Sequence, residues 1–234
     1  MVQGASNLVP EAYTLTNAQS FFAVFEFVND IREIVHPEWF DYIADTYVQD
    51  QSYSYVPDPL PNISGYVIAP KVSLKGKITL PASYNGKPII KIASHFASAQ
   101  SGLPQEITHI FCEKGSQLRE IKANAFVGNP VLKYFDFSPN TVRFIDSMAF
   151  NMCTALDATN FSLSNSLWYI GYMAFTAAFK PTASPVTLKV PGSVVVVHDY
   201  GFANLNVSQG STLYVGDSEN YSNLNLALPA LSDD

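Results

Sequence analysis

A phenylalanine follows a β-branched residue at a distance of five positions four times along this chain. The residue before the phenylalanine is alanine in the first three copies and glycine in the fourth. The phenylalanines are 24, 25 and 27 residues apart, a period typical of solenoids, whose coils bury their apolar faces only against neighbouring coils. The sequence therefore predicts a stack of similar coils that share one column of phenylalanine rings. The four pairs are Ile121 and Phe126, Ile145 and Phe150, Ile170 and Phe175, and Val197 and Phe202.

Each copy also carries the residues of two short strands. An apolar residue stands eight positions before each phenylalanine, and a segment further upstream alternates in character, as at Phe135 and Phe137. Alternation of period two is typical of a half-buried strand, and the Gly, Pro, Asn and Ser residues between the segments predict turns. An upstream copy with one residue fewer contains Ile92 and Phe96. We expect an α/β repeat solenoid whose coils hold two short strands and a short helical turn around the Ala-Phe pair.

The segment VRFIDSMAFNMCTAL, from Val142 to Leu156, resembles the repeat of the BspA-type leucine-rich repeat family, L-x-x-I-x-x-x-A-F-x-x-C-x-x-L. LREIKANAFVGNPVL and LWYIGYMAF are similar to the same pattern. The resemblance covers about residues 63–222. It implies a right-handed leucine-rich-repeat solenoid with a strand ladder on one face, and a role in adhesion or protein binding rather than in chemistry.

Three parts are expected along the chain. Residues 1–57 are predicted to form an acidic helical arm and linker, residues 58–222 the solenoid of about five coils with a C-terminal capping strand, and residues 223–234 a tail. The net charge is -7, and the arm holds eight acidic residues against Arg32 alone. A neutral solenoid without a basic stripe disfavours nucleic acid, and an acidic arm disfavours anionic membranes. The expected partner is a protein, either other subunits of an assembly or a second copy of this chain, or a surface glycan.

The arm is predicted to contain two helices. A capping box at Thr16 and Gln19, followed by apolar residues at helical spacing, indicates an amphipathic helix over about 17–35. Pro37 predicts the start of a second helix, whose apolar stripe is Trp39, Phe40, Ile43 and Tyr47. Prolines between residues 50 and 62 predict an extended linker.

Two roles are open for this arm. It caps the open N-terminal end of its own solenoid, as repeat arrays require for solubility, or it docks on another subunit. The side chains predicted to carry the docking are Phe21, Phe25, Val28, Ile31, Trp39 and Phe40.

Membrane insertion is not expected. No apolar run reaches the roughly 18 residues that a membrane helix needs, and the first 20 residues lack the basic start of a signal peptide. Together with the resemblance, this leaves a virion or the cell surface and extracellular space as the expected location.

Candidate groups for catalysis are few. Cys153 occupies the slot that Asn129 fills in a sister coil, and Cys112 alternates with Ile110 on a strand, so both are predicted to be buried structural residues. The four histidines lack the spacing of a metal site, and no Gly-rich phosphate loop or nucleophile elbow occurs. We therefore predict no enzyme activity, no metal and no cofactor.

A protein-binding patch is predicted on the strand ladder. The two residues between the apolar ends of each strand core cannot both point inward, so they should form columns across the coils. The middle columns hold arginine and aromatic residues, which anchor protein interfaces. The predicted patch is Arg143, Phe144, Trp168 and Tyr169. In the alternative interpretation the arm or the linker lies over these residues and hides them.

Two hypotheses for function follow. In the first, the protein is a non-catalytic structural or protein-interaction subunit whose arm docks it into a larger assembly, such as a phage virion of the tail or baseplate type. In the second, it is a bacterial cell-surface or secreted adhesin or receptor-binding module.

Overall fold

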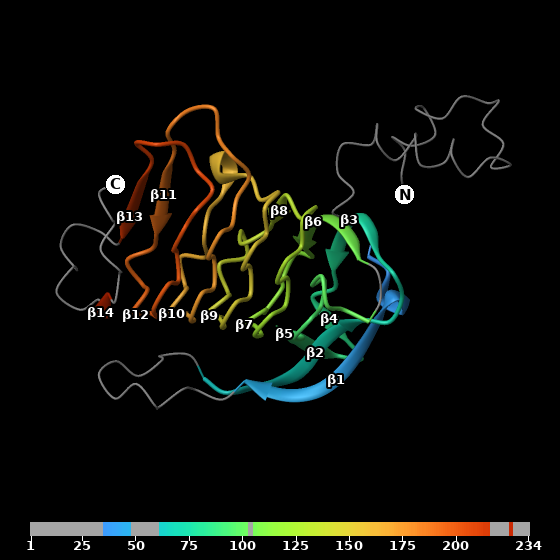
Figure 1. Cartoon of the computed structure of the whole chain (residues 1–234). Coiled ribbons are helices and arrows are strands. Elements are labelled where there is room, and N and C mark those ends of the chain that lie inside the picture. Colours follow the sequence, from blue (N-terminus) through green and yellow to red (C-terminus); the bar gives the residue numbers. More distant parts are fainter. Residues whose placement is uncertain (1–34, 48–60, 103–104, 216–224, 227–234) are drawn as a thin grey trace, which may run out of the picture.

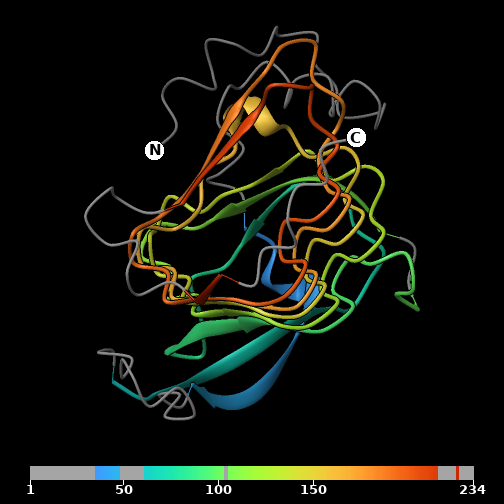
Figure 2. The ribbon, with the colours of Figure 1, turned by 60° about the vertical axis from the view of Figure 1, so that its left-hand side comes forward.

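The computed structural model of this protein describes residues 35–47, 61–102, 105–215 and 225–226. Over these residues, short strands follow one another along the molecule and the coils form a stack (Figure 1). In the view turned by 60° the successive coils trace similar outlines (Figure 2). The repeat in the sequence therefore corresponds to a solenoid.

One face of the stack is a sheet that contains nine of the described strands, in the order β1-β2-β5-β7-β9-β10-β12-β14, with β4 paired to β5. From β2 onward along this order the pairing is parallel, as expected for strands that each belong to one coil. The strands are β1 Phe40–Tyr47, β2 Ile63–Pro70, β4 Ser83–Tyr84, β5 Lys87–Ile92, β7 Glu120–Ile121, β9 Phe144–Ile145, β10 Tyr169–Ile170, β12 Val196–Val197 and β14 Asn225–Leu226.

The other side of the coils carries two smaller parallel ladders (Figure 1). Strands β3 (Lys75–Leu80), β6 (Glu106–Cys112) and β8 (Tyr134–Phe135) form the first. Strands β11 (Thr187–Val190) and β13 (Thr212–Val215) form the second. The ladder is interrupted between β8 and β11, where the chain forms a short 3-10 helix, η3 (Ala158–Asn160).

The phenylalanines of successive coils form one column inside the stack. Ring centroids lie 5.0 Å apart between Phe126 and Phe150, 5.2 Å between Phe150 and Phe175, and 5.1 Å between Phe175 and Phe202. Phe96 of the upstream coil extends the column, at 5.9 Å from Phe126. All five rings are buried in one continuous hydrophobic core, so the predicted shared column is confirmed.

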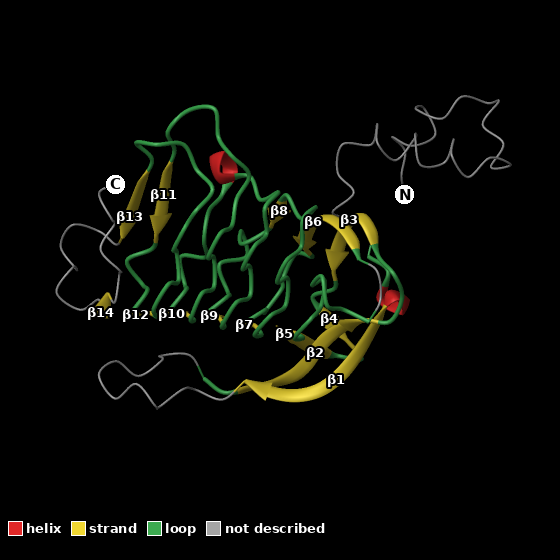
Figure 3. Cartoon of the chain, in the orientation of Figure 1, coloured by secondary structure: helices red, strands yellow, loops and turns green. Residues whose placement is uncertain are grey.

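The expectation of helical turns around the Ala-Phe pairs is wrong. In Figure 3 these segments are loops, and within the described residues helix is confined to η2 (Pro37–Trp39) and η3. Each pair is flanked by two residues in the left-handed region of φ, which a right-handed helix excludes. In one coil they are Met148 at φ 57° and Met152 at φ 56°.

Hydrogen bonds between coils explain this geometry. The amides of Phe126, Phe150 and Phe175 each donate to the carbonyl of the residue immediately before the next Phe of the column. These carbonyls belong to Ala149, Ala174 and Gly201, and all three distances are 2.8 Å. Intervening amides bond within their own turn, as Ala149 N does to Asp146 O at 3.2 Å. Half of the amides therefore bind the neighbouring coil, and none is left to build the i to i−4 ladder of an α-helix.

The segment predicted to form the second helix of the arm is a strand in the structure. Residues 40–47 form β1, which pairs antiparallel with all eight residues of β2. Phe40 is buried against Phe96, at 6.2 Å between ring centroids, and Tyr42 stacks on Tyr84 at 3.8 Å. Ile43, which a helical stripe would bury, is 57% exposed. The helix expected over 17–35 and the linker expected over 50–62 lie almost wholly outside the described residues.

Of the residues predicted for assembly docking, two are described. Phe40 belongs to the core of its own solenoid, and Trp39 packs partly buried against that core. Phe40 is therefore buried within its own chain, whereas Trp39 keeps part of its surface exposed. The other four, Phe21, Phe25, Val28 and Ile31, lie outside the described residues.

Candidate protein-binding face

The outer face of the large sheet is organised by strict register between coils. Lys91, Glu120, Phe144, Tyr169 and Val196 are successive register partners, so they form one column across strands β5, β7, β9, β10 and β12. The residue after each of them in the middle coils, such as Ile145 or Ile170, is fully buried in the core. One of the two predicted columns is therefore present as a row of half-buried side chains.

The structure changes the predicted patch of four residues. Trp168 is 2% exposed and Arg143 is 6% exposed, so neither presents a surface to a partner. The Arg143 guanidinium donates a hydrogen bond to the carbonyl of Ser166 in the next coil, at 2.6 Å. Trp168 is buried outside the main core cluster, with its ring 5.4 Å from that of Phe144. Phe144 and Tyr169 remain half-buried, with ring centroids 5.4 Å apart.

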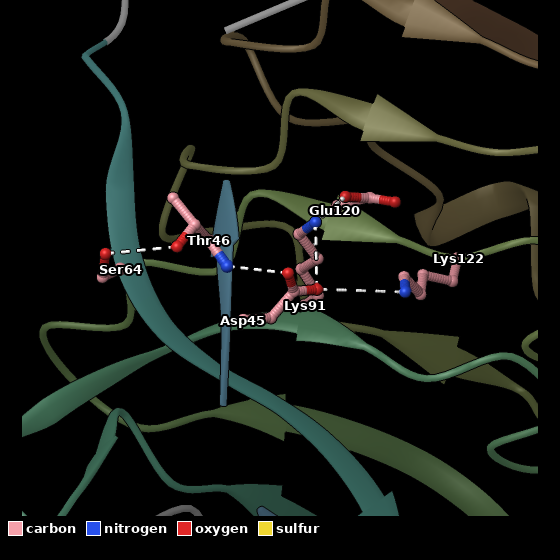
Figure 4. Close-up of polar contacts among 6 residues, drawn as sticks. All are labelled: Asp45, Thr46, Ser64, Lys91, Glu120 and Lys122. Atoms are coloured by element: carbon pink, nitrogen blue, oxygen red, sulfur yellow. Dashed lines mark hydrogen bonds and ion pairs between the residues drawn. The ribbon is translucent and has the colours of Figure 1, made fainter. Parts of the chain in front are cut away.

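Strand β1 crosses the outer face of the first coils and is held there by charge. Lys91 Nζ lies 3.2 Å from a carboxylate oxygen of Asp45 on β1 and 3.1 Å from one of Glu120 on β7 (Figure 4). Lys122 lies 3.9 Å from the same Asp45 oxygen. Tyr47, at the end of β1, has its ring 5.9 Å from Phe144 of the third strand in the column. For these residues, the interpretation that the arm covers its own solenoid is supported.

This network shifts the ionisation of its members. Burial alone would raise the pKa of Asp45, but the Thr46 amide at 2.7 Å and the Lys91 ammonium hold that pKa below its ordinary value. Burial alone would lower the pKa of Lys91, but the carboxylates of Glu120 and Asp45 raise it above the usual value. Both groups are therefore charged at neutral pH, and β1 is fastened to two coils.

We expect Asp45→Asn to lower the free energy of unfolding at pH 7 by about 1 kcal/mol, the upper range for a partly exposed ion pair. Because the pKa of Asp45 is lower in the folded state than its unfolded value of about 3.9, its contribution is present above that pH and lost as the pH falls through the folded value. Urea denaturation should therefore show the two proteins converging near pH 2. A difference in the free energy of unfolding that is the same at pH 7 and near pH 2 would contradict the network. Asp41→Asn, at an exposed position on the same strand, is the control.

Beyond the end of β1, the fourth and fifth coils hold two pairs of aromatic side chains, here together called the aromatic patch: Tyr169 with His198, and Tyr172 with Tyr200. The Tyr169 and His198 rings meet edge to face at 5.4 Å, and those of Tyr172 and Tyr200 at 6.1 Å. Tyr172 is 39% exposed and Tyr200 is 45% exposed. Exposed tyrosines on successive coils are typical anchors of protein interfaces.

Sequence reasoning found Tyr169 but missed the other three residues. It considered only the strand columns, whereas Tyr172 and Tyr200 stand in the turns that follow β10 and β12. The sequence does distinguish Tyr172, because the equivalent position, three residues before the Phe, holds Ala123 and Ser147 in the preceding coils. A large aromatic residue at a slot that small residues fill elsewhere indicates a role outside the core.

The two cysteines are buried, as predicted. Burial raises the pKa of the Cys112 thiol to about 12 and also raises the pKa of the Cys153 thiol. Cys153 Sγ donates to the carbonyl of Phe126 in the preceding coil at 3.1 Å. No cluster of His, Cys, Asp and Glu able to hold a metal ion occurs among the described residues. In the same part of the chain, no helix is both long and apolar enough to span a membrane.

We expect neither thiol to react with a disulfide reagent at pH 8 while the protein is folded, because the thiolate is the reactive form and both thiols are buried. Two thiols should titrate rapidly once guanidinium unfolds the chain. Native reaction should be at least about 100-fold slower than that of a free thiol, limited by opening of the structure. A thiol that reacts in the native state at the rate of free cysteine would show that it is accessible to solvent and not buried between coils.

Comparisons with known proteins agree with this architecture. No curated protein matches the chain. A leucine-rich repeat protein from Bacteroides ovatus ATCC 8483 is 18% identical over 78% of this chain, with a TM-score of 0.47, and the match spans 41% of that protein's length. The leucine-rich repeat protein of T. pallidum is 18% identical over 79% of this chain and 86% of its own, with a TM-score of 0.50.

The second of these similarities is one of fold. At the level of sequence, six copies of the BspA type leucine rich repeat region match residues 104–209. These copies contain the four aligned Phe turns and the coils that carry the aromatic patch. The repeat region of this chain, residues 104–209, belongs to the BspA-type leucine-rich repeat family.

Proposed function

We propose that this protein is a non-catalytic binding module whose aromatic patch recognises a protein partner outside the cell or on its surface. A leucine-rich repeat solenoid serves as a scaffold for protein interaction or structure, since its repeated coils create an extended binding surface. The observation that carries the proposal is the exposure of Tyr172 and Tyr200, whose rings meet across two successive coils that also hold the ring pair of Tyr169 and His198.

The position of β1 favours this proposal over docking through the arm. Asp45 and Tyr47 of β1 occupy the outer face over Lys91, Glu120 and Phe144, so a partner meets the later coils. Phe40 is part of the solenoid core and cannot be withdrawn to bind a neighbour without opening the stack. An adhesin or receptor-binding module therefore fits the described residues better than a subunit of a virion that docks through Trp39 and Phe40.

The test is site-specific photo-crosslinking. A photoreactive phenylalanine analogue is placed at position 172, at position 200 and, as the control, at position 214. Tyr214 lies on β13 outside the patch and is 39% exposed, the same as Tyr172. The proposal expects one partner to be captured from positions 172 and 200 but not from 214. With that partner purified, Tyr172→Ser combined with Tyr200→Ser should raise Kd at least about 10-fold, as expected for hot-spot residues, while Tyr214→Ser should not.

Deletion of residues 1–34 separates this proposal from arm docking. The deletion leaves β1 in place, whereas removal of residues 1–57 would expose Phe96 by removing Phe40. Arm docking predicts that the full chain is an oligomer in solution and that the chain without residues 1–34 is a monomer that no longer binds the partner. That result would contradict binding through the aromatic patch. A captured partner that is a particle subunit indicates a virion, and one that is a host surface protein indicates an adhesin.

A further inference from the structure

We propose a second binding site, for an acidic saccharide that carries carboxylate groups, on the opposite side of the solenoid. A groove of about 740 Å³ lies there between β6, β8 and the segment around η3. It forms where the ladder is interrupted, because the chain after β8 leaves the register to make η3 instead of a further strand. The lining residues that matter for recognition are His109, Lys133, Tyr134, Asp157, Asn160 and Lys180.

The groove is basic, although the chain as a whole carries a net charge of -7. Lys133 and Lys180 lie in its wall and are exposed. Burial lowers the pKa of His109, and the positive charges of Lys77 and Lys133 lower it further. The lining carries one carboxylate, Asp157, against these two lysines.

Asp157 is engaged in hydrogen bonds within its own segment, at the start of η3. Its oxygens accept hydrogen bonds from Thr159 N at 3.0 Å, Thr159 Oγ1 at 2.7 Å and Asn160 Nδ2 at 3.0 Å. These bonds, followed by the Lys180 ammonium, keep the pKa of Asp157 below its ordinary value. The carboxylate thus caps η3 and fixes the Asn160 amide at the rim of the groove, and the ammonium groups of Lys133 and Lys180 are exposed to a ligand.

The rings of His109 and Tyr134 line another part of the groove, and Phe111 packs beside them outside its lining. The His109 ring lies 6.2 Å from both Phe111 and Tyr134, and Phe111 lies 5.5 Å from Tyr134. All three side chains are half-buried. Apolar ring faces suit the C–H face of a pyranose, amide and hydroxyl groups suit its hydroxyls, and an ammonium suits its carboxylate. Two lysine ammonium groups suit a ligand that carries single carboxylates on its sugars, as a uronate chain does, whereas a sulfated glycan or a nucleic acid has a higher charge density.

The test is titration calorimetry of the full chain with tetragalacturonate at low salt. We expect binding that weakens as salt is added, at least about 10-fold weaker binding of the fully methyl-esterified tetramer, and a similar loss in Lys133→Ala combined with Lys180→Ala. The matched control is Lys71→Ala with Lys114→Ala, two exposed lysines that remove the same charge outside the groove. It should bind like the natural protein.

Three results would overturn the inference: no binding of tetragalacturonate, equal loss in both double variants, or tighter binding of oligoglutamate or of a heparin fragment than of tetragalacturonate. The latter two ligands test for an acidic peptide and for a sulfated glycan. All four substitutions are at exposed side chains, and thermal denaturation checks that each variant is folded. The Tyr172→Ser and Tyr200→Ser variant should keep its uronate affinity, so that failure here and failure of the proposed protein-binding function are distinguishable.

Discussion

Replacing Phe150 by alanine is expected to lower the free energy of unfolding by about 3–5 kcal/mol. The ring is completely buried and lies between Phe126 at 5.0 Å and Phe175 at 5.2 Å, with Phe135 at 5.7 Å. The substitution removes its apolar surface from the core and leaves a cavity between two coils that cannot close without shifting the backbone bonds between them. Urea denaturation followed by circular dichroism measures the loss.

Met152→Ala is the control for this prediction. Met152 stands two residues after Phe150 in the same turn and is 54% exposed, so its truncation should change stability by less than about 0.5 kcal/mol. The account is contradicted if Phe150→Ala lowers the free energy of unfolding by less than about 1 kcal/mol. Such a small loss is expected only for a ring that is not packed between the rings of two neighbouring coils.

The second large effect is expected at Asn129, whose substitution by alanine should cost about 3 kcal/mol. Its side chain is buried and makes three hydrogen bonds: Nδ2 donates to Ala97 O of the preceding coil at 2.7 Å, and Oδ1 accepts from Val131 N and Leu132 N, both at 2.9 Å. Alanine leaves these backbone groups without their partner in a place with little access to water. Thermal or urea unfolding reports the change.

Two comparisons sharpen this prediction. Cys153 fills the same slot one coil later and makes one side-chain bond, to Phe126 O, so Cys153→Ala should cost less than Asn129→Ala. Asn165→Ala, at an exposed asparagine, should be close to neutral. If Asn129→Ala and Asn165→Ala lower the free energy of unfolding equally, the hydrogen bonds of the Asn129 side chain, including the one to Ala97 O, do not stabilise the fold.

The repeat and its buried column could be predicted from sequence because both are periodic. The spacing of Phe126, Phe150 and Phe175 requires each coil to present the same residue at the same place, and a ring that size must be buried. The turn conformation could not be predicted in the same way. Left-handed backbone is usually signalled by glycine, but here it falls on Met148, Met173 and Tyr200, and the inter-coil hydrogen bonds that favour it are visible only when coils are stacked.

The arm shows why a short apolar stripe is ambiguous. Phe40, Ile43 and Tyr47 fit one face of a helix, yet the eight backbone pairs with β2 and the ion pairs of Asp45 decide for a strand. Those interactions join residues far apart in the sequence, so tertiary contacts override the local pattern. The same kind of contact buries Trp168 and Arg143, which sequence reasoning placed on the surface.

Native-state hydrogen exchange at the amides of Phe126, Phe150 and Phe175 tests the central claim, that the coils share one continuous core, most directly. Each amide bonds to the following coil, so all three should exchange only through global unfolding, with equal free energies that match urea denaturation. In Phe150→Ala the three values should fall together by the full loss of stability. Three different free energies in the natural protein, or a fall confined to the Phe150 amide, would contradict a shared core.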